Sequence, residues 1–258
     1  YITFDEFIHI LTKHKLKFIR QEEKFLLSDK VSEPLLVDEK ILNYFTFKNE
    51  LIQRLKKTDI KLKLNSKFKK SNLQDYDKVI IATYCNNNTI LKELNIDLKT
   101  QYQYELVEKI IVKLPDRYKN LSCVVIDGAF VNIDPYLGTQ YHLLSDVKYS
   151  KIEKSISYEP TFNNDKKNYI NMGVINDKKQ SNFDKFIEHG REYLDFLAEA
   201  SYIGSFYTVR TILPHKEKTD ERPTHINLFE DKKLISIFSG KWNSCVSTAH
   251  DLYDILRD

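Results

Sequence analysis

The sequence predicts an α+β fold, in which an α/β-like part is joined to a mixed, largely antiparallel sheet with flanking helices. Residues 79–82 are apolar without interruption, as in a strand that is covered on both faces, and residues 234–238 are a mainly apolar run of the kind that a buried strand shows. The second run leads through a glycine-containing turn into a helical pattern. Between the two runs, residues 100–156 alternate apolar and polar side chains in segments divided by turn residues, which indicates antiparallel hairpins.

Composition limits the possible functional classes. A chain of 258 residues can bury one large core or two small ones. The net charge of +3 is too small to indicate a nucleic-acid partner, and no run approaches the ~20 apolar residues of a membrane span. Three scattered cysteines predict neither a disulfide framework nor a metal site, and they fit a reducing, cytoplasmic location. The chain opens at Tyr1 inside a helical pattern, so we expect a missing upstream segment.

The N-terminal residues predict a helix and then an extended segment. An apolar stripe in residues 4–11 follows Thr3 or Asp5, either of which can cap the helix. Residues 31–37 contain a proline and a hydrophobic pair, which is typical of an edge strand.

A second amphipathic helix is predicted within residues 38–57, with Thr46 as its cap. The side chains expected on its buried face are Phe47, Leu51, Ile52 and Leu55. Residues 60–64 then alternate strictly and predict a half-exposed strand, for which residues 67–69 are a possible partner.

The middle of the chain predicts a meander of strands. These strands are residues 101–114, 121–126, 129–133, 141–144 and 147–156. Turns are expected at residues 127–128 and 134–135, and residues 157–180 are expected to form a loop. A strong helix is predicted over residues 181–198, followed by a strand over residues 201–213.

Two strand ends are candidate binding positions. Thr83 and Tyr84 follow the apolar run near residue 80, and ligands of open α/β sheets lie beyond the carboxyl ends of strands. Residues 239–243 lead a second strand into a helix that Asn243 or Ser244 can cap, and free amides there suit an anion or an electron-rich ring edge. The alternatives are an ordinary core strand with an Asn-rich turn, and an ordinary βα turn.

Cationic and aromatic side chains on strands add further candidates. Arg210 lies in an apolar strand, where its planar fork suits a carboxylate or phosphate, and the alternative is an internal ion pair with an Asp or Glu. Arg222 is either a strand-end anchor or a surface charge. The rings of Tyr102, Tyr104 and Tyr141 could cover a flat ligand, or they could be ordinary core residues.

Three segments, in order, resemble the FAD-dependent oxidoreductases of the D-amino-acid oxidase/glycine oxidase superfamily. Residues 76–84 are similar to the second FAD-contacting strand of that family. Residues 207–210, with Leu213-Pro214 and Arg222-Pro223, are similar to elements near the substrate pocket. Residues 238–242, with the sequence Phe-Ser-Gly-Lys-Trp, are similar to the late turn that reaches the flavin.

The resemblance implies an FAD cofactor and a small anionic substrate, such as an amino or hydroxy acid, that transfers a hydride to flavin N5. The cofactor contacts that it implies are Ala82, Thr83, Tyr84, Ser239, Gly240, Lys241 and Trp242. Arg210 would hold the anionic group of the substrate, with Tyr104 and Tyr141 as further catalytic residues. Tyr84 departs from the pattern, because the family usually has glycine at that position.

The resemblance also implies a division into domains. Residues 31–99 and 214–258 would be the remainder of an FAD-binding domain, and residues 1–30 and 100–213 a substrate-binding domain with the antiparallel sheet. The family's Gly-x-Gly-x-x-Gly unit is absent, which implies either the C-terminal portion of a longer enzyme or a chain that has lost firm FAD binding, with weak or no FAD retention. The alternatives are a non-catalytic module that binds an anion through Arg210 and, for basic residues 61–70, nucleic-acid binding.

Overall fold

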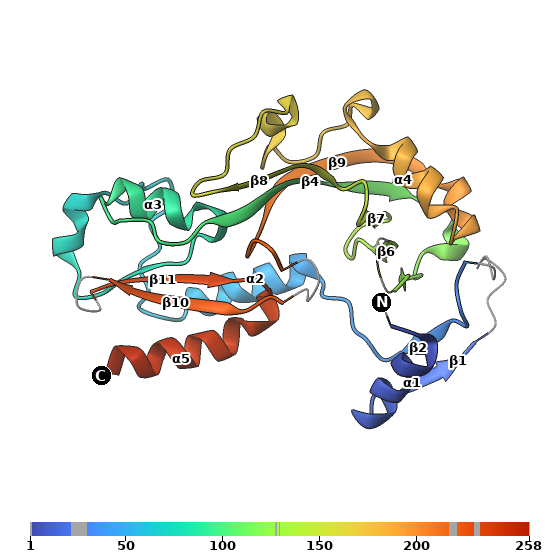
Figure 1. The fold of residues 1–258 in the computed structure, drawn as a ribbon, viewed down its shortest axis with the longest axis horizontal. Helices are drawn as coiled ribbons and strands as arrows, with labels where there is room; N and C mark the ends of the chain where they lie inside the picture. Colours follow the sequence, from blue (N-terminus) through green and yellow to red (C-terminus); the bar gives the residue numbers. More distant parts are fainter. Residues whose placement is uncertain are drawn as a thin grey trace. The chain divides into compact units, whose positions relative to one another are not determined.

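The structure is a computed structural model that describes residues 2–21, 30–126, 128, 130–216, 221–229 and 233–257. It contains helices together with parallel and antiparallel sheets (Figure 1), which confirms the predicted α+β class. The chain forms two compact units, which we call unit 1 and unit 2. Unit 1 consists of Tyr1–Lys61, Glu108–Lys151 and Asn168–Tyr207, and unit 2 of Leu62–Val107, Ile152–Lys167 and Thr208–Asp258. The assignment of cofactor and substrate domains stays a prediction.

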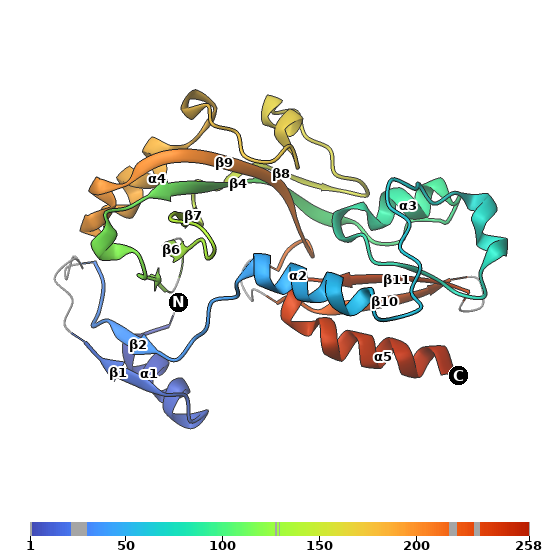
Figure 2. The same cartoon turned by 180° about the vertical axis from the view of Figure 1, so that it is seen from behind.

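The largest sheet is the predicted meander. Its strand order is β5 (Cys123–Val124), β6 (Val131–Pro135), β7 (His142–Asp146), β4 (Tyr102–Lys113) and β8 (Lys151–Ser157), and β9 (Ser201–Ile212) pairs with β4. Strands β4 and β9 lie side by side in both views (Figures 1 and 2). The turn expected at residues 134–135 is wrong, because both residues lie within β6. The chain turns later, near Gly138, whose φ of +91° is readily adopted only by glycine.

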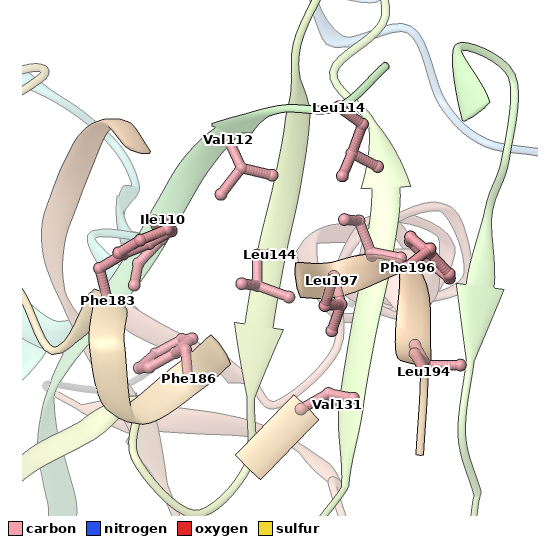
Figure 3. Packing of buried hydrophobic residues seen from close by; sticks show 11 residues of the cluster. Ile110, Val112, Leu114, Val131, Leu144, Phe183, Phe186, Leu194, Phe196 and Leu197 are labelled. Carbon is pink, nitrogen blue, oxygen red and sulfur yellow. The ribbon is translucent and has the colours of Figure 1, made fainter. Parts of the chain in front are cut away.

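The core of unit 1 lies between this sheet and helix α4 (Phe183–Gly190), as Figure 3 shows. Its buried residues are Ile110, Val112, Leu114, Val131, Ile133, Leu144, Phe183, Phe186, Leu194, Phe196 and Leu197. The predicted helix over residues 181–198 is shorter than expected, because α4 ends at Gly190 and a 3₁₀ segment follows at Asp195–Glu199. A Cβ at position 190 would lie 2.5 Å from Leu197 Cδ1, so this close approach requires a glycine.

A buried carboxylate connects the loop before α4 to the sheet. Glu108 of β4 is fully buried and accepts hydrogen bonds from the Ser181 hydroxyl at 2.5 Å and the Ser205 hydroxyl at 2.6 Å. The Asn182 amide donates to the same carboxylate at 3.0 Å, and the Tyr207 hydroxyl lies 3.3 Å from it. Buried charge is tolerated when it is hydrogen-bonded in this way, so Glu108 fixes the start of α4 on the sheet.

A second buried polar pair holds α4 from its other end. Asp146 accepts hydrogen bonds from the amides of Lys148 and Tyr149, both at 2.7 Å, which closes the turn after β7. Its second oxygen lies 2.6 Å from Nδ1 of His189 on α4. The rings of Tyr149 and Tyr193 meet the His189 ring edge to face. This pair therefore orients His189 within the core of unit 1.

The N-terminal elements agree only partly with the prediction. Helix α1 (Phe4–Lys13) is capped by Thr3, whose hydroxyl and backbone exchange hydrogen bonds with Glu6 in a capping box. Short antiparallel strands β1 (Phe18–Arg20) and β2 (Leu35–Val37) follow. The expected edge strand at residues 31–37 is therefore present, but only its last three residues form β2.

Helix α2 (Tyr44–Leu55) corrects two predictions. Asn43 is its cap, since the Asn43 side chain accepts a hydrogen bond from the amide of Thr46. None of its residues is buried, so the predicted buried face is wrong: Leu51, Ile52 and Leu55 are exposed and Phe47 is half-buried. Residues 60–64 form no strand, nor do residues 67–69, although the alternation predicted one.

Unit 2 contains the two apolar runs that predicted the α/β-like part. They form β3 (Val79–Ile81) and β11 (Leu234–Ser239), which are parallel neighbours, and β10 (Thr224–Phe229) pairs with β11 in the antiparallel sense. Helix α3 (Asn87–Glu93) follows β3, and α5 (Cys245–Arg257) follows β11. The core of unit 2 consists of Leu73, Ile81, Leu91, Leu94 and Leu234. Strand β3 is not covered on both faces, because Ile80 is 42% exposed.

The buried tyrosines predict a loss of stability at alkaline pH. Burial raises the pKa values of Tyr102, Tyr104 and Tyr207 above the ordinary value of about 10. These phenols therefore ionise at a lower pH in the unfolded chain than in the folded protein. We therefore expect a free energy of unfolding that is unaffected by these groups below pH ~10 and falls above it, by about 1.4 kcal/mol per pH unit for each such tyrosine. Urea unfolding at a series of alkaline pH values, with tyrosinate absorbance, measures this effect; tyrosinate that appears before unfolding would contradict it.

Candidate functional site

The carboxyl ends of β3 and β11 lie at the same edge of the sheet in unit 2. The strands are parallel, with Val79 opposite Leu234 and Ile81 opposite Ser236. Residues that follow them, Thr83 after β3 and Gly240 after β11, therefore leave the sheet at the same edge. We call this the strand-end edge.

One buried side-chain amide joins the segments that follow β3 and end β11 at the strand-end edge. The Asn87 side chain donates a hydrogen bond to the carbonyl of Ile237 at 2.7 Å. Its oxygen accepts from the amide of Thr83 at 2.8 Å and from the Thr83 hydroxyl at 3.0 Å. Because Asn87 is almost fully buried, these three bonds fix the end of β3 relative to β11.

Tyr84 has a backbone conformation that favours glycine. Its φ is +56°, in the left-handed region that a bulky residue adopts only when other contacts stabilise it. Its hydroxyl accepts a hydrogen bond from the amide of Thr211 at 2.8 Å and donates to the carbonyl of Thr211 at 3.1 Å. Its ring is parallel to that of Phe238, with centroids 6.1 Å apart. Burial raises the pKa of Tyr84, so the phenol remains a donor.

The contacts of the Tyr84 hydroxyl predict a stability effect. Replacing Tyr84 with Phe keeps the ring but leaves the amide and carbonyl of buried Thr211 without this partner. We expect the free energy of unfolding to fall by about 1–3 kcal/mol, the cost of unpaired buried polar groups. Urea unfolding measures it, with Tyr253→Phe on the exposed face of α5 as the control, for which the change should stay within ~0.5 kcal/mol. Equal stabilities of both variants would contradict the role of this hydroxyl.

Arg210 on β9 forms the internal ion pair that the sequence left open as an alternative. Its Nε lies 2.8 Å from Oε2 of Glu105 on β4, although the N–H is not aligned on that oxygen as a hydrogen bond. The Gln103 side chain donates to the other oxygen of Glu105 at 2.8 Å. Glu105 and Gln103 are buried, whereas the Arg210 side chain is 39% exposed. A guanidinium with this exposure can still contact a ligand, but Glu105 offsets part of its charge.

Hydroxyl groups close the turn after β11. Ser239 Oγ donates to the carbonyl of Lys241 at 2.7 Å and lies 2.7 Å from Ser244 Oγ. Thr224 Oγ1 lies 3.2 Å from both serine hydroxyls. Gly240 is required by close packing rather than by a positive φ, because a Cβ there would lie 2.9 Å from Cβ of Arg222.

The predicted tyrosines occupy different surroundings. Tyr104 is almost fully buried in unit 2, where its hydroxyl donates to the carbonyl of Tyr158 at 3.0 Å. Burial also raises its pKa, as expected of a core tyrosine. Tyr141 belongs to unit 1, on the hairpin between β6 and β7, and is half-buried. The roles of both residues in catalysis stay predictions.

Unit 2 thus contains all of the predicted site residues except Tyr141. Sequence reasoning missed Asn87, Gln103, Glu105 and Thr211, which hold the predicted residues in place. The Asn-rich stretch after β3 was a signal for Asn87, and a carboxylate within an apolar strand was a signal for Glu105. Thr211 takes part through its backbone, which no side-chain pattern can indicate.

The exposed groups at the strand-end edge fit a flat ring better than a phosphate. Tyr84 is 39% exposed, Trp242 is 58% exposed, and the ammonium of Lys241 is also exposed. The hydroxyls of Thr83 and Ser239 are already hydrogen-bonded within the chain. A ring system could therefore contact these aromatic faces, while the sequence offers no glycine-rich loop to bind a pyrophosphate.

Other classes of site receive no support from the described part of the chain. Within it, no group of three or more His, Cys, Asp or Glu side chains could hold a metal ion. None of its helices has the length and hydrophobicity to cross a bilayer. A shallow hollow beside α1, lined by Ile2, Asp5, Glu6, His9 and Ile10, contains none of the predicted site residues.

Comparison with known proteins gives one partial similarity. No protein-family model and no curated protein sequence matches the chain. Among solved structures, the chain is similar to glycine oxidase from Geobacillus kaustophilus, with 12% sequence identity and a TM-score of 0.41. The matched region covers 65% of this chain and 37% of the glycine oxidase chain.

Proposed function

We propose that this chain is part of a flavin-dependent oxidoreductase that oxidises a small anionic substrate, such as an amino or hydroxy acid. The observation that carries the proposal is the strand-end edge, where the chain leaves two adjacent parallel strands at Thr83 and Gly240. The Tyr84 hydroxyl connects this edge to the backbone of Thr211, the residue after Arg210. Unit 2 thus contains the cation Arg210 for an anionic substrate and the exposed rings of Tyr84 and Trp242 for a flat cofactor.

In this proposal the side chains and backbone of the protein bind the cofactor and the substrate and orient them. Tyr84, Lys241 and Trp242 would contact the cofactor ring, with Ala82, Thr83, Ser239 and Gly240 forming the backbone beneath it. A bound flavin would supply the hydride acceptor, so no side chain is needed as a redox group. Arg210 would bind the anionic group of the substrate and fix its orientation, which lowers the entropic cost of the reaction. Tyr104 is buried in unit 2, and we propose that its packing supports the residues of the site.

The test uses protein expressed from the complete reading frame that contains residues 1–258. The purified protein should show the two visible absorption bands of oxidised flavin, and an amino or hydroxy acid should bleach them in the absence of oxygen. A colourless protein that gains no flavin bands when FAD is added, and that consumes none of these acids, would contradict the proposal.

A non-catalytic module that binds a small anion through Arg210 is the second candidate. It is favoured by the hydrogen bonds at the strand-end edge, because Thr83, Tyr84 and Ser239 already have partners within the chain. An edge that is satisfied in this way can be stable without a cofactor. Calorimetric titration of the colourless protein with small carboxylates distinguishes the two, since a module should bind them without flavin.

A further inference from the structure

Three polar side chains of unit 1 have no part in the proposed function. Side chains alternate between the two faces of a strand, and Ile110 and Leu144 belong to the core on the α4 side of the sheet (Figure 3). Their neighbours in sequence, Lys109 on β4 and Ser145 on β7, therefore lie on the opposite face. Asn132 on β6 lies on this face as well, because it is paired with Ser145. We call Lys109, Ser145 and Asn132 the polar row, and all three belong to unit 1.

The register of the strands places the polar row side by side on three adjacent strands. Strands β4 and β7 are antiparallel with Ile110 opposite Leu144, so Lys109 and Ser145 occupy the next position along the two strands. Ser145 is in turn directly opposite Asn132. Facing residues of adjacent strands have Cβ atoms about 5 Å apart, and the lysine side chain is long and flexible. A small ligand above Ser145 can therefore contact all three side chains.

The hydroxyl and the ammonium of the polar row lack partners. The Ser145 hydroxyl oxygen is buried and forms no hydrogen bond within the described part of the chain. Lys109 forms neither a hydrogen bond nor an ion pair with any residue that the structure describes. Lys109 is exposed, yet the atoms packed around it partly desolvate its ammonium and lower its pKa. A bound anion would stabilise this charge and accept a hydrogen bond from the hydroxyl.

The carboxylate of Asp134 acts on Lys109 without pairing with it. Its charge raises the pKa of Lys109, which offsets part of the effect of desolvation. Asp134 itself accepts hydrogen bonds from the Ser122 hydroxyl at 2.6 Å and from the Asn132 amide at 3.0 Å. The Asn132 amide has two N–H donors, so this bond uses only one of them. The alternative to a ligand site is a lysine that serves only as a remote counterion of Asp134.

We propose that the polar row binds an oxyanion, the carboxylate or phosphate group of a small ligand. The ammonium supplies the positive charge, and the hydroxyl and the amide of the neighbouring strands supply two further donors. Ile111 and Leu143 lie on the same face, and Ile111 is 3% exposed, so apolar atoms adjoin the row. Beside apolar atoms these donors bind an anion more strongly than the same groups would in bulk water. The site requires no flavin, so it is independent of the proposed function.

Acetylation of Lys109 by a neutral N-hydroxysuccinimide ester, quantified by peptide mass spectrometry, tests this inference. The protein is expressed from its complete reading frame, and phosphate or malonate replaces chloride at constant ionic strength. At least one of these anions should slow the acetylation of Lys109 several-fold, because a bound anion favours the protonated amine and shields it. Lys113, exposed on the same face of β4, is the matched control, and its rate should not change. The anion that protects at the lower concentration identifies the preferred group.

Two variants distinguish a binding site from a structural lysine. Ser145→Ala removes one donor, so it should raise the anion concentration needed for protection by roughly 2–10-fold. Asp134→Asn removes a negative charge and should lower that concentration several-fold. A lysine that is only a counterion would instead change its basal acetylation rate in Asp134→Asn and show no protection by anions. No protection beyond that in chloride, equal slowing of Lys109 and Lys113, or an unchanged anion dependence in Ser145→Ala would overturn the proposal.

Discussion

Replacing Arg210 with Met is expected to weaken the binding of a small anionic substrate by about 100-fold or more. A guanidinium can form two charge-assisted hydrogen bonds with a carboxylate, and each contributes roughly 1.5–3 kcal/mol. Methionine has a similar length but no charge, so both bonds are lost. The change in KM, or in the Kd of a competitive carboxylate, measures the effect. Unchanged affinity in Arg210→Met would remove Arg210 from the substrate site.

Arg210 also lies beside the buried carboxylate of Glu105, so its replacement affects stability as well as anion binding. Variants of Glu105 separate these two effects. Arg210→Met alone should lower the free energy of unfolding by about 2–3 kcal/mol, less than for a fully buried pair since Arg210 is 39% exposed. Adding Glu105→Gln should restore stability but not anion binding. Glu105→Gln alone should strengthen anion binding several-fold, because it removes the negative charge that lies 2.8 Å from the guanidinium.

Replacing Glu108 with Ala is expected to be the most destabilising single change in unit 1, at about 4 kcal/mol. The substitution removes the acceptor for the hydroxyls of Ser181 and Ser205 and for the amide of Asn182, all at 3.0 Å or less. Ser205 is buried and Ser181 and Asn182 are half-buried, so each donor loses its partner away from bulk water at a cost of roughly 1–3 kcal/mol, and hydroxyl rotation recovers part of this. Urea or thermal unfolding measures the loss.

Two variants test the origin of the Glu108 effect. Ser205→Ala removes one donor and leaves the carboxylate with its other partners, so it should cost only about 1–2 kcal/mol. Glu108→Gln keeps one acceptor oxygen but places an N–H₂ group against donors, so its cost should lie between those of Ser205→Ala and Glu108→Ala. If Glu108→Ala proved no less stable than Ser205→Ala, the carboxylate would not be the centre of this network.

The sequence predicted those parts of the fold in which the pattern of one segment is enough to indicate its secondary structure. The apolar run at residues 79–82 indicated a strand of a parallel sheet and the run at residues 234–238 indicated a buried strand, and β3 and β11 are parallel neighbours. The alternation of residues 101–114 predicted β4 almost to its ends. In both cases the apolar pattern located the strand but not its burial, since Ile80 of β3 is 42% exposed and the polar residues Gln103 and Glu105 of β4 are buried.

The predictions failed where burial depends on a partner segment. The apolar face of α2 and the alternation of residues 60–64 have the patterns of buried elements, yet both are exposed. A pattern identifies the face that can be buried, but not whether another element covers it. At the candidate site, Asn87 was missed for a related reason, since an asparagine in a turn looks the same whether it faces solvent or joins two strands.

The central claim is that the strand-end edge and Arg210 serve one flavin and one anionic substrate. The most direct test is a difference absorption spectrum of the flavin, recorded while a non-reactive carboxylate is added to protein expressed from its complete reading frame. The claim predicts that the carboxylate perturbs the flavin bands, and that Arg210→Met retains the flavin but loses this perturbation. A protein without flavin, or an equal perturbation in Arg210→Met, would contradict it.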